Sequence, residues 1–314
     1  TLVGGLAGDA LTDADFNVAV GYAALSAAIT GERNTGVGYA ALATDTKGQR
    51  NVAVGMGTLQ SQNFTTATNS YNVAVGYDAG NDITTGVNNT LIGALAGDAM
   101  TTGSNNVGVG VHAIGTGTVT GDNNTAMGAN AGGALTSGDN NLLLGHDAGV
   151  SGSPGGPVGA DNNVACLGDE NIASLHCQVS LTVSSDQRDK TDFVELDLGL
   201  DFVKALEPVT YYWDKRSKYG DKYADDYDLN AQTPDGTHKE DWMDVGFKAQ
   251  AVRDLEEAAG YTAAAKKNLT VSLSTDGKQL GLKYEKFIPI LVKAIKDQDA
   301  IITSLTARIA ALES

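Results

Sequence analysis

The 314-residue chain is poor in several residue types, and each shortage excludes a class of protein. It has two cysteines, Cys166 and Cys177, which are too few for a disulfide framework and lack a zinc-binding spacing. It has no run near the roughly 18 apolar residues that a membrane helix needs, and no charged-then-apolar leader. We therefore expect a soluble segment without membrane insertion. Because the chain begins at Thr1 rather than Met, we also expect residues upstream of it.

Basic residues are scarce, especially in the first part of the chain. The net charge is −17; residues 1–184 hold 3 Lys and Arg against 14 Asp and Glu, and residues 185–314 hold 18 against 24. The electrostatic field of so negative a chain repels nucleic acid and anionic membranes. We therefore expect no nucleic-acid partner.

Glycine and tryptophan divide the chain into two regions near residue 184. Of 39 glycines, 32 lie before that point, whereas both tryptophans lie after it. The length also exceeds that of one typical domain. We therefore expect at least two structural units.

The first region is a repeat. Short apolar runs end in glycine at intervals of mostly 17 residues, and an asparagine stands four residues before eight of these glycines. Each unit reads Asn-apolar-small-apolar-Gly, then two residues, then usually Ala, then a polar turn. The glycines are Gly4, Gly21, Gly38, Gly55, Gly76, Gly93, Gly110, Gly128, Gly145 and Gly168.

This repeat predicts a mainly β stalk over residues 1–170. A three-residue strand cannot bury a face alone, but stacked units can, with equivalent residues ~4.8 Å apart. We expect the asparagines to form a hydrogen-bonded ladder and the longer intervals, 60–71 and 151–162, to form loops. The pattern resembles the head repeats of trimeric bacterial adhesins and the collar-like repeats of phage tail fibres. That resemblance implies a trimeric parallel β-roll or β-helix whose hand stays open.

The second region reads as an α+β domain. Apolar spacing predicts a helix from Phe193 to Leu206, closed by Pro208. We expect strands at 209–213 and 280–284, a long loop at 214–240, and a strand running into a helix at 244–254.

The chain ends in a helix with heptad spacing. Isoleucine occupies one core position and mostly leucine the other, which predicts a coiled coil over residues 287–314. Isoleucine at the first core position and leucine at the second would by themselves favour a dimer. The trimer prediction therefore depends on the repeats and on family resemblance. The two sets are Ile288, Ile295, Ile302 and Ile309, and Leu291, Gln298, Leu305 and Leu312.

Five motifs in order carry a more specific resemblance. They are the segments 185–190, 206–208, 245–250 and 282–284 and the terminal helix. Together they resemble the intramolecular chaperone domain at the ends of phage tail spikes and fibres, a self-cleaving peptidase family. The resemblance implies a connector at 171–184 and a chaperone domain at 185–286 that trimerises, folds the stalk and then cleaves itself off.

The same resemblance assigns the cleavage residues. It implies that Ser185 is the nucleophile, Lys190 the general base and Ser184–Ser185 the scissile bond, while Asp186 and Arg188 hold the loop. A lysine can activate a serine only when neutral, and its ordinary pKa is ~10.4. We expect trimer assembly to bury Lys190 and so to delay cleavage until folding is complete.

Other chemistry is weakly indicated. His112 and His146 fall near equivalent repeat positions and read as stacked surface residues rather than metal ligands. The Asp- and Asn-rich segments 121–124 and 138–141 read as turns rather than calcium sites. We expect no metal, no cofactor and at most one turnover per chain.

The sequence therefore predicts the distal part of a homotrimeric phage tail fibre or spike. We expect it in the virion after synthesis in the host cytoplasm, with a host-surface glycan or protein as a candidate partner. One alternative is a bacterial trimeric adhesin, which should end in membrane-spanning strands. Others are a regulator that releases a DNA-binding part, and the stalk of a polysaccharide-degrading spike whose catalytic domain precedes Thr1.

Overall fold

The computed structural model describes residues 1–178, 180, 182–224, 226–274 and 276–313. They form two compact units. The first comprises Thr1–Ile172 and Arg216–Thr233, and the second comprises Ala173–Lys215 and Pro234–Ser314. The segment 216–233 thus groups with the repeats, although the sequence places it inside the expected chaperone domain.

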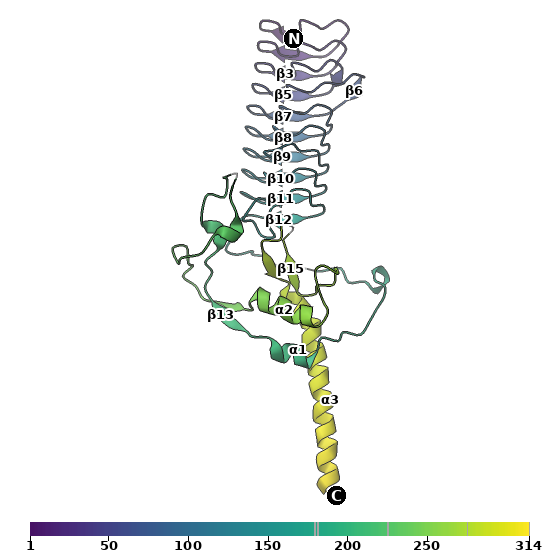
Figure 1. The fold of residues 1–314 in the computed structure, drawn as a ribbon. Helices are drawn as coiled ribbons and strands as arrows, with labels where there is room; N and C mark the ends of the chain where they lie inside the picture. Colours follow the sequence, from purple (N-terminus) through teal and green to yellow (C-terminus); the bar gives the residue numbers. More distant parts are fainter. Residues whose placement is uncertain (179, 181, 225, 275, 314) are drawn as a thin grey trace. The chain divides into compact units, whose positions relative to one another are not determined.

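The first unit is a β-solenoid, which confirms the expected mainly β repeat fold. Its strands stack in one parallel sheet of 10, and each strand pairs in register with its equivalent one turn away, as Val52 does with Val73 (Figure 1). The strands are β1 (Leu2–Val3), β2 (Val18–Val20), β3 (Thr35–Val37), β5 (Val52–Val54), β7 (Val73–Val75), β8 (Thr90–Ile92), β9 (Val107–Val109), β10 (Thr125–Met127), β11 (Leu142–Leu144) and β12 (Ala165–Leu167).

The asparagines form the expected ladder inside the solenoid. The side-chain oxygen of each accepts the backbone N–H of the equivalent residue one turn later, at 2.8 to 3.0 Å. Most also donate Nδ2 to a turn carbonyl, as Asn106 does to Gly121 at 2.9 Å. The ladder satisfies backbone groups that would otherwise be buried without partners.

Apolar side chains fill the rest of the interior. The middle residue of each strand points inward and is mostly alanine or glycine, so the solenoid is narrow. Most turns add one large, fully buried apolar side chain, and each such burial stabilises the fold by ~1.5–3 kcal/mol. These side chains are Leu25, Leu42, Leu59, Ile83, Met100, Ile114 and Leu135.

The glycine that ends each strand is required by close stacking. Gly110 has φ +139°, and a Cβ there would collide with the backbone carbonyl of Gly128 on the next turn. Residues with side chains rarely adopt this φ. The glycine column therefore permits the tight bend and the close approach of consecutive turns.

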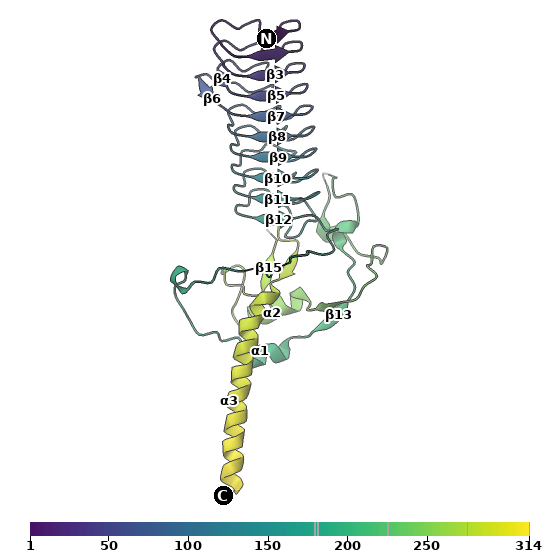
Figure 2. The same cartoon turned by 180° about the vertical axis from the view of Figure 1, so that it is seen from behind.

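The interval 60–71 forms a loop, as expected. It carries β6 (Thr68–Asn69), which pairs in parallel with β4 (Gly48–Gln49) at the side of the solenoid (Figure 2). Gln62 anchors the loop by donating Nε2 to the buried Asp45 carboxylate at 2.5 Å.

The second unit is a small α+β domain. Its core contains Leu198, Phe202, Val252, Val271, Phe287 and Ile290. Its elements are η1 (Gln187–Asp189), α1 (Leu200–Ala205), β13 (Val209–Tyr211), β14 (Asp244–Gly246), α2 (Ala249–Ala258), β15 (Val271–Leu273), β16 (Leu280–Leu282), η4 (Tyr284–Lys286) and α3 (Phe287–Glu313). The pairs β13–β14 and β15–β16 are antiparallel. The segment 216–233 adds η2 (Arg216–Lys218) and η3 (Leu229–Ala231) to the first unit.

The predicted helix from Phe193 to Leu206 is wrong over its first half. The helix α1 begins only at Leu200, after Gly199, whose φ and ψ are −130° and −134°. Asp297 on α3 accepts the Leu200 N–H at 3.1 Å and so caps the shorter helix from outside. The terminal helix is confirmed as α3, with Ser314 outside the described residues. No described helix is long and apolar enough to span a membrane.

Candidate functional site

The motif that begins at Ser185 forms a short capped turn. The Asp186 carboxylate accepts the Arg188 N–H at 2.9 Å and forms an ion pair with its guanidinium at 2.6 Å. These hydrogen bonds with Arg188 lower the pKa of Asp186 below its ordinary value. Asp186 thereby begins η1 and fixes the path of the chain between Ser185 and Lys190.

The turn brings Ser185 and Lys190 together. The Lys190 Nζ lies 2.5 Å from the Ser185 Oγ and 3.2 Å from the Ser185 carbonyl oxygen. This separation is within the reach of direct proton transfer. The two side chains predicted from sequence therefore lie within hydrogen-bond distance of each other.

Both side chains are exposed to solvent. A general base must accept the hydroxyl proton, which requires a neutral amine, and burial is what favours that form of a lysine. The single chain brings the Lys190 amine close to the Ser185 hydroxyl but does not bury it. The roles of Ser184, Ser185 and Lys190 in cleavage stay a prediction.

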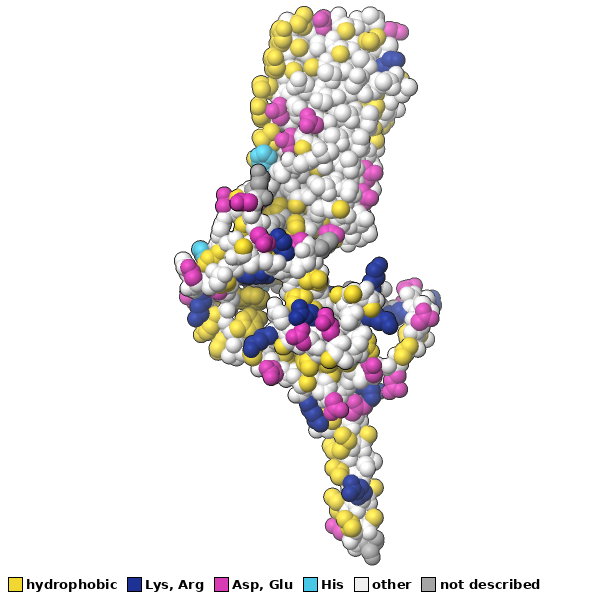
Figure 3. All heavy atoms as spheres, in the orientation of Figure 1, with side chains coloured by type: hydrophobic (Ala, Val, Ile, Leu, Met, Phe, Trp, Pro, Cys, Tyr) yellow, Lys and Arg dark blue, Asp and Glu magenta, His cyan; other side chains and the backbone are white. Residues whose placement is uncertain are grey.

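An apolar column follows the outer face of the solenoid sheet. The last strand residue of most turns is Val, Ile, Leu or Met, and Ile92, Met127 and Leu167 are 41%, 45% and 48% exposed. The residue after the glycine continues this surface in several turns, with the Tyr22 and Tyr39 rings stacked at 5.7 Å. Hydrophobic atoms run down one edge of the solenoid in Figure 3. So long an apolar surface is typical of an interaction face.

The helix α3 carries a second exposed apolar stripe. Phe287, Ile290 and Ala294 are buried in the core of the second unit. The heptad positions are exposed, with Ile295 at 64% and Leu305 at 48%. The helix therefore has one face for its own domain and one without a partner among the described residues.

A buried ion cluster holds the segment 216–233 in the first unit. The Lys222 Nζ lies 2.8 Å from Asp147 and 2.9 Å from Glu170, which belong to consecutive turns. The Tyr223 hydroxyl donates to Asp147 at 2.5 Å. All three charged groups are largely buried, so this cluster is a specific anchor. Sequence reasoning did not find it.

The charges of the cluster stabilise one another. Burial alone would raise the pKa of Asp147, but hydrogen bonds from Lys222, Tyr223 and Asn130 outweigh burial and lower it. Burial would lower the pKa of Lys222, but the two carboxylates outweigh it and raise that pKa. Burial, together with Asp147, raises the pKa of Tyr223 to about 12.

A group with metal-ligand chemistry lies beside this cluster. His146, Asp147 and Asp169 have ligand atoms within 4.8 Å of one another among the described residues. The Lys222 ammonium already occupies the Asp147 oxygen that faces His146. The position therefore favours the lysine cation over a metal ion. The absence of metal ligands stays a prediction.

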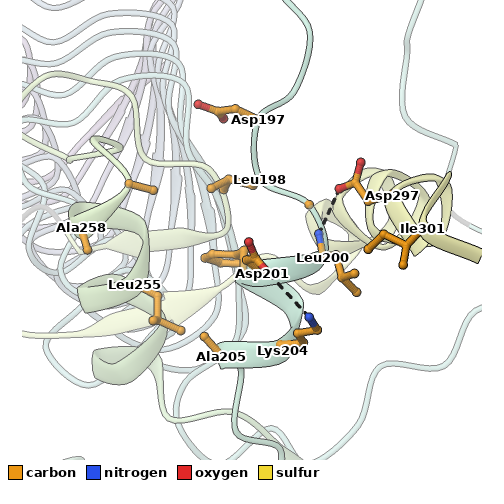
Figure 4. Close-up of a pocket in the computed structure, with 13 residues that line it drawn as sticks. Asp197, Leu198, Leu200, Asp201, Lys204, Ala205, Leu255, Ala258, Asp297 and Ile301 are labelled. Carbon is orange, nitrogen blue, oxygen red and sulfur yellow. Dashed lines mark hydrogen bonds and ion pairs between the residues drawn. The ribbon is translucent and has the colours of Figure 1, made fainter. Parts of the chain in front are cut away.

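One cavity lies between α1, α2 and α3 in the second unit, with a volume of about 500 Å³ (Figure 4). Leu255, Ala258 and Ile301 give it an apolar wall. Its polar contacts serve α1: Asp297 caps the helix, and Lys204 pairs with Asp201 at 3.7 Å. None of its lining residues is Ser, Cys or His, so the predicted cleavage residues lie outside it.

Comparison with known proteins identifies the second region. Residues 185–261 match the family described as chaperone of endosialidase, and the match begins at the predicted nucleophile, Ser185. Neither the curated proteins nor the solved structures gave a match. The chain thus carries a chaperone-of-endosialidase domain after a β-solenoid, an organisation that fits a tail spike or tail fibre.

Proposed function

We propose that the chain is the distal part of a homotrimeric phage tail fibre or spike in the virion. Its C-terminal domain aligns three chains, and each chain then cuts itself once before Ser185. The solenoid persists as the stalk and contacts a host-surface molecule.

The observation that carries the proposal is the pair of exposed apolar surfaces. Within the first unit the sheet column runs from turn to turn, within the second unit the α3 stripe follows the heptad positions, and many side chains of both are exposed among the described residues. Leaving both in water is unfavourable by ~25 cal/mol per Å² of apolar surface. Other copies of the same chain would cover both at once, because parallel copies place equivalent columns side by side.

The cleavage step is an acyl shift followed by hydrolysis. The Ser185 Oγ attacks the Ser184 carbonyl carbon and gives its proton to Lys190 Nζ. The peptide C–N bond breaks, the departing nitrogen takes that proton, and an ester joins the two serines. Water then hydrolyses the ester, leaving a carboxylate on Ser184 and a free amine and hydroxyl on Ser185.

Native mass spectrometry tests the assembly in a Ser185→Ala background, which keeps the chain whole. We expect a trimer of the 32.3 kDa chain. Ile302→Asp places a charge in the exposed α3 stripe and should shift the population towards monomer. Thr303→Asp adds the same charge outside the heptad positions and should leave the trimer intact. A monomeric Ser185→Ala protein would contradict the proposal.

A further inference from the structure

The lysine, arginine, phenylalanine and tyrosine residues of the repeats are confined to the N-terminal turns. Every Lys, Arg, Phe, Tyr and Trp within residues 1–172 lies between positions 16 and 77. Turns from residue 78 to residue 172 fold in the same way without any of them. The solenoid fold therefore does not require these side chains. They are Phe16, Tyr22, Arg33, Tyr39, Lys47, Arg50, Phe64, Tyr71 and Tyr77.

One backbone column shows this difference most clearly. The residue before each ladder asparagine has a left-handed φ of 48° to 65°. Later turns place asparagine there, at 88, 105, 123 and 140, and at 163 before Val164, which suits this conformation. The early turns place Phe16, Arg33, Arg50 and Tyr71 there, although such side chains disfavour it. Folding alone would favour asparagine in all of these turns.

The four side chains form a surface ladder. The Arg33 guanidinium lies 5.2 Å from the centre of the Phe16 ring, and that of Arg50 lies 5.6 Å from the centre of the Tyr71 ring. Their backbones belong to successive turns, ~4.8 Å apart. We call Phe16, Arg33, Arg50 and Tyr71 the basic-aromatic column.

The column exposes one cation without a carboxylate partner. Arg33 forms an ion pair with Glu32. Among the described residues, no carboxylate lies within ion-pair distance of Arg50, whose fork carries five N–H donors. Phe16 is 74% and Tyr71 46% exposed. Figure 3 shows a group of Lys and Arg atoms near the N-terminal end of the solenoid, on the side where Figure 1 shows β6.

We propose that the basic-aromatic column binds an anionic sugar unit of a cell-surface glycan. The planar guanidinium of Arg50 can donate two parallel hydrogen bonds to a pair of oxygens of a carboxylate, phosphate or sulfate group. The Tyr71 ring offers a flat apolar face to the sugar ring beside that group. This inference rests on the proposed role in host attachment and gives that role a location and a ligand class.

Charge favours a glycan over nucleic acid. One unpaired guanidinium suits a single anionic unit, whereas 14 acidic residues against 3 basic ones in residues 1–184 repel a long polyanion. Assembly between copies explains the column less well. The apolar sheet face extends over all turns, but the basic-aromatic column covers only four of them.

Binding to a printed array of neutral, carboxylated, phosphorylated and sulfated glycans tests the proposal. Arg50→Asn and Tyr71→Asn introduce the residue that the later turns carry, so both should fold in the Ser185→Ala background. The matched control is Lys266→Asn, which removes an exposed cation at φ 53° in the second unit. We expect binding to one anionic class, an about ten- to hundredfold loss for Arg50→Asn, a smaller loss for Tyr71→Asn and none for the control.

Three outcomes would overturn the proposal. They are the absence of binding to every anionic glycan, equal binding to neutral glycans, and binding that Arg50→Asn leaves unchanged. Native mass spectrometry of the same variants separates the two claims. Loss of the trimer in Arg50→Asn would make the column an assembly contact, whereas an intact trimer without glycan binding would leave the proposed function standing.

Discussion

The solenoid and the second unit are stabilised in opposite ways. In the solenoid, equivalent residues of consecutive turns contact each other in the sheet, in the asparagine ladder and in the glycine column. In the second unit, contacts join unlike segments, as when Asp297 on α3 caps α1. Near-identical turns leave the register between neighbouring chains weakly specified, whereas unlike contacts fix it. The comparison explains why a repetitive stalk would need a non-repetitive domain to align its chains.

The largest expected effect comes from breaking the repeat itself. Gly110→Ala places a Cβ against the Gly128 carbonyl at a φ of +139°, and we expect destabilisation of more than about 4 kcal/mol. Thermal unfolding and the yield of soluble protein measure it. Gly117→Ala is the control, because a Cβ there meets nothing within 4 Å. Equal melting temperatures for the two variants would contradict the stacking argument.

The next effect breaks the buried ion cluster that holds the segment 216–233 against the repeats. Lys222→Ala leaves Asp147 and Glu170 as buried carboxylates without their shared cation, at a cost of about 3–5 kcal/mol. Hydrogen–deuterium exchange should become faster in residues 216–233 and in the last solenoid turn. Lys266→Ala, at an exposed site, should change neither. Unchanged protection in Lys222→Ala would remove the cluster as an anchor.

Acid should abolish the same anchor. The folded state lowers the pKa of Asp147 below its ordinary 3.8, so the stabilisation is complete above that value and is lost as the pH falls through the lower, folded pKa. The pKa of Lys222 is raised above 10.5, so its contribution is lost only as the pH rises through the higher, folded value. The difference in unfolding free energy between wild type and Lys222→Ala should therefore be constant from about pH 5 to 9 and shrink in acid. Urea titrations across this range measure it, and a difference that persists below the folded pKa would contradict the assignment.

A smaller effect distinguishes the buried asparagines of the ladder from the exposed asparagines beside them. Asn106→Ala leaves the Asn124 N–H without its acceptor, and we expect a loss of about 1–3 kcal/mol. Asn105→Gly removes only an exposed hydrogen bond from Asn88 and keeps a residue that tolerates the φ of 59° there, and we expect less than about 0.5 kcal/mol. Urea unfolding of the two neighbouring variants makes the comparison. Similar losses for both would mean that the buried ladder is not specifically stabilising.

The repeat could be read from sequence because its physics is local and periodic. The ladder asparagines and bend glycines recur at a fixed spacing, so one turn predicts the next. The α1 error has the opposite origin: apolar spacing from Phe193 suggested helix, but Gly199 and the distant Asp297 set its first residue. The strand β15 (Val271–Leu273) was not expected either, although residues 269–274 alternate between apolar and polar side chains.

The residues of the candidate site also differ in whether a local sequence pattern carries them. Ser185 and Lys190 could be predicted because a short motif carries them, and the structure places their side chains in contact. The Lys222 cluster could not, since it joins positions far apart in sequence and a single lysine in a charged loop has no pattern. Asp147 gave no signal either, because the equivalent position carries Asp78, His112 and Asn130 in other turns.

The central claim is that the boundary between the two regions is a bond that the chain cuts itself. Intact-mass spectrometry of purified wild type beside Ser185→Ala and Lys190→Ala tests it most directly. The account predicts two wild-type fragments, residues 1–184 and 185–314, and one uncut 32.3 kDa chain for each variant. A single full-length mass for the wild type, or cutting in Ser185→Ala, would contradict it.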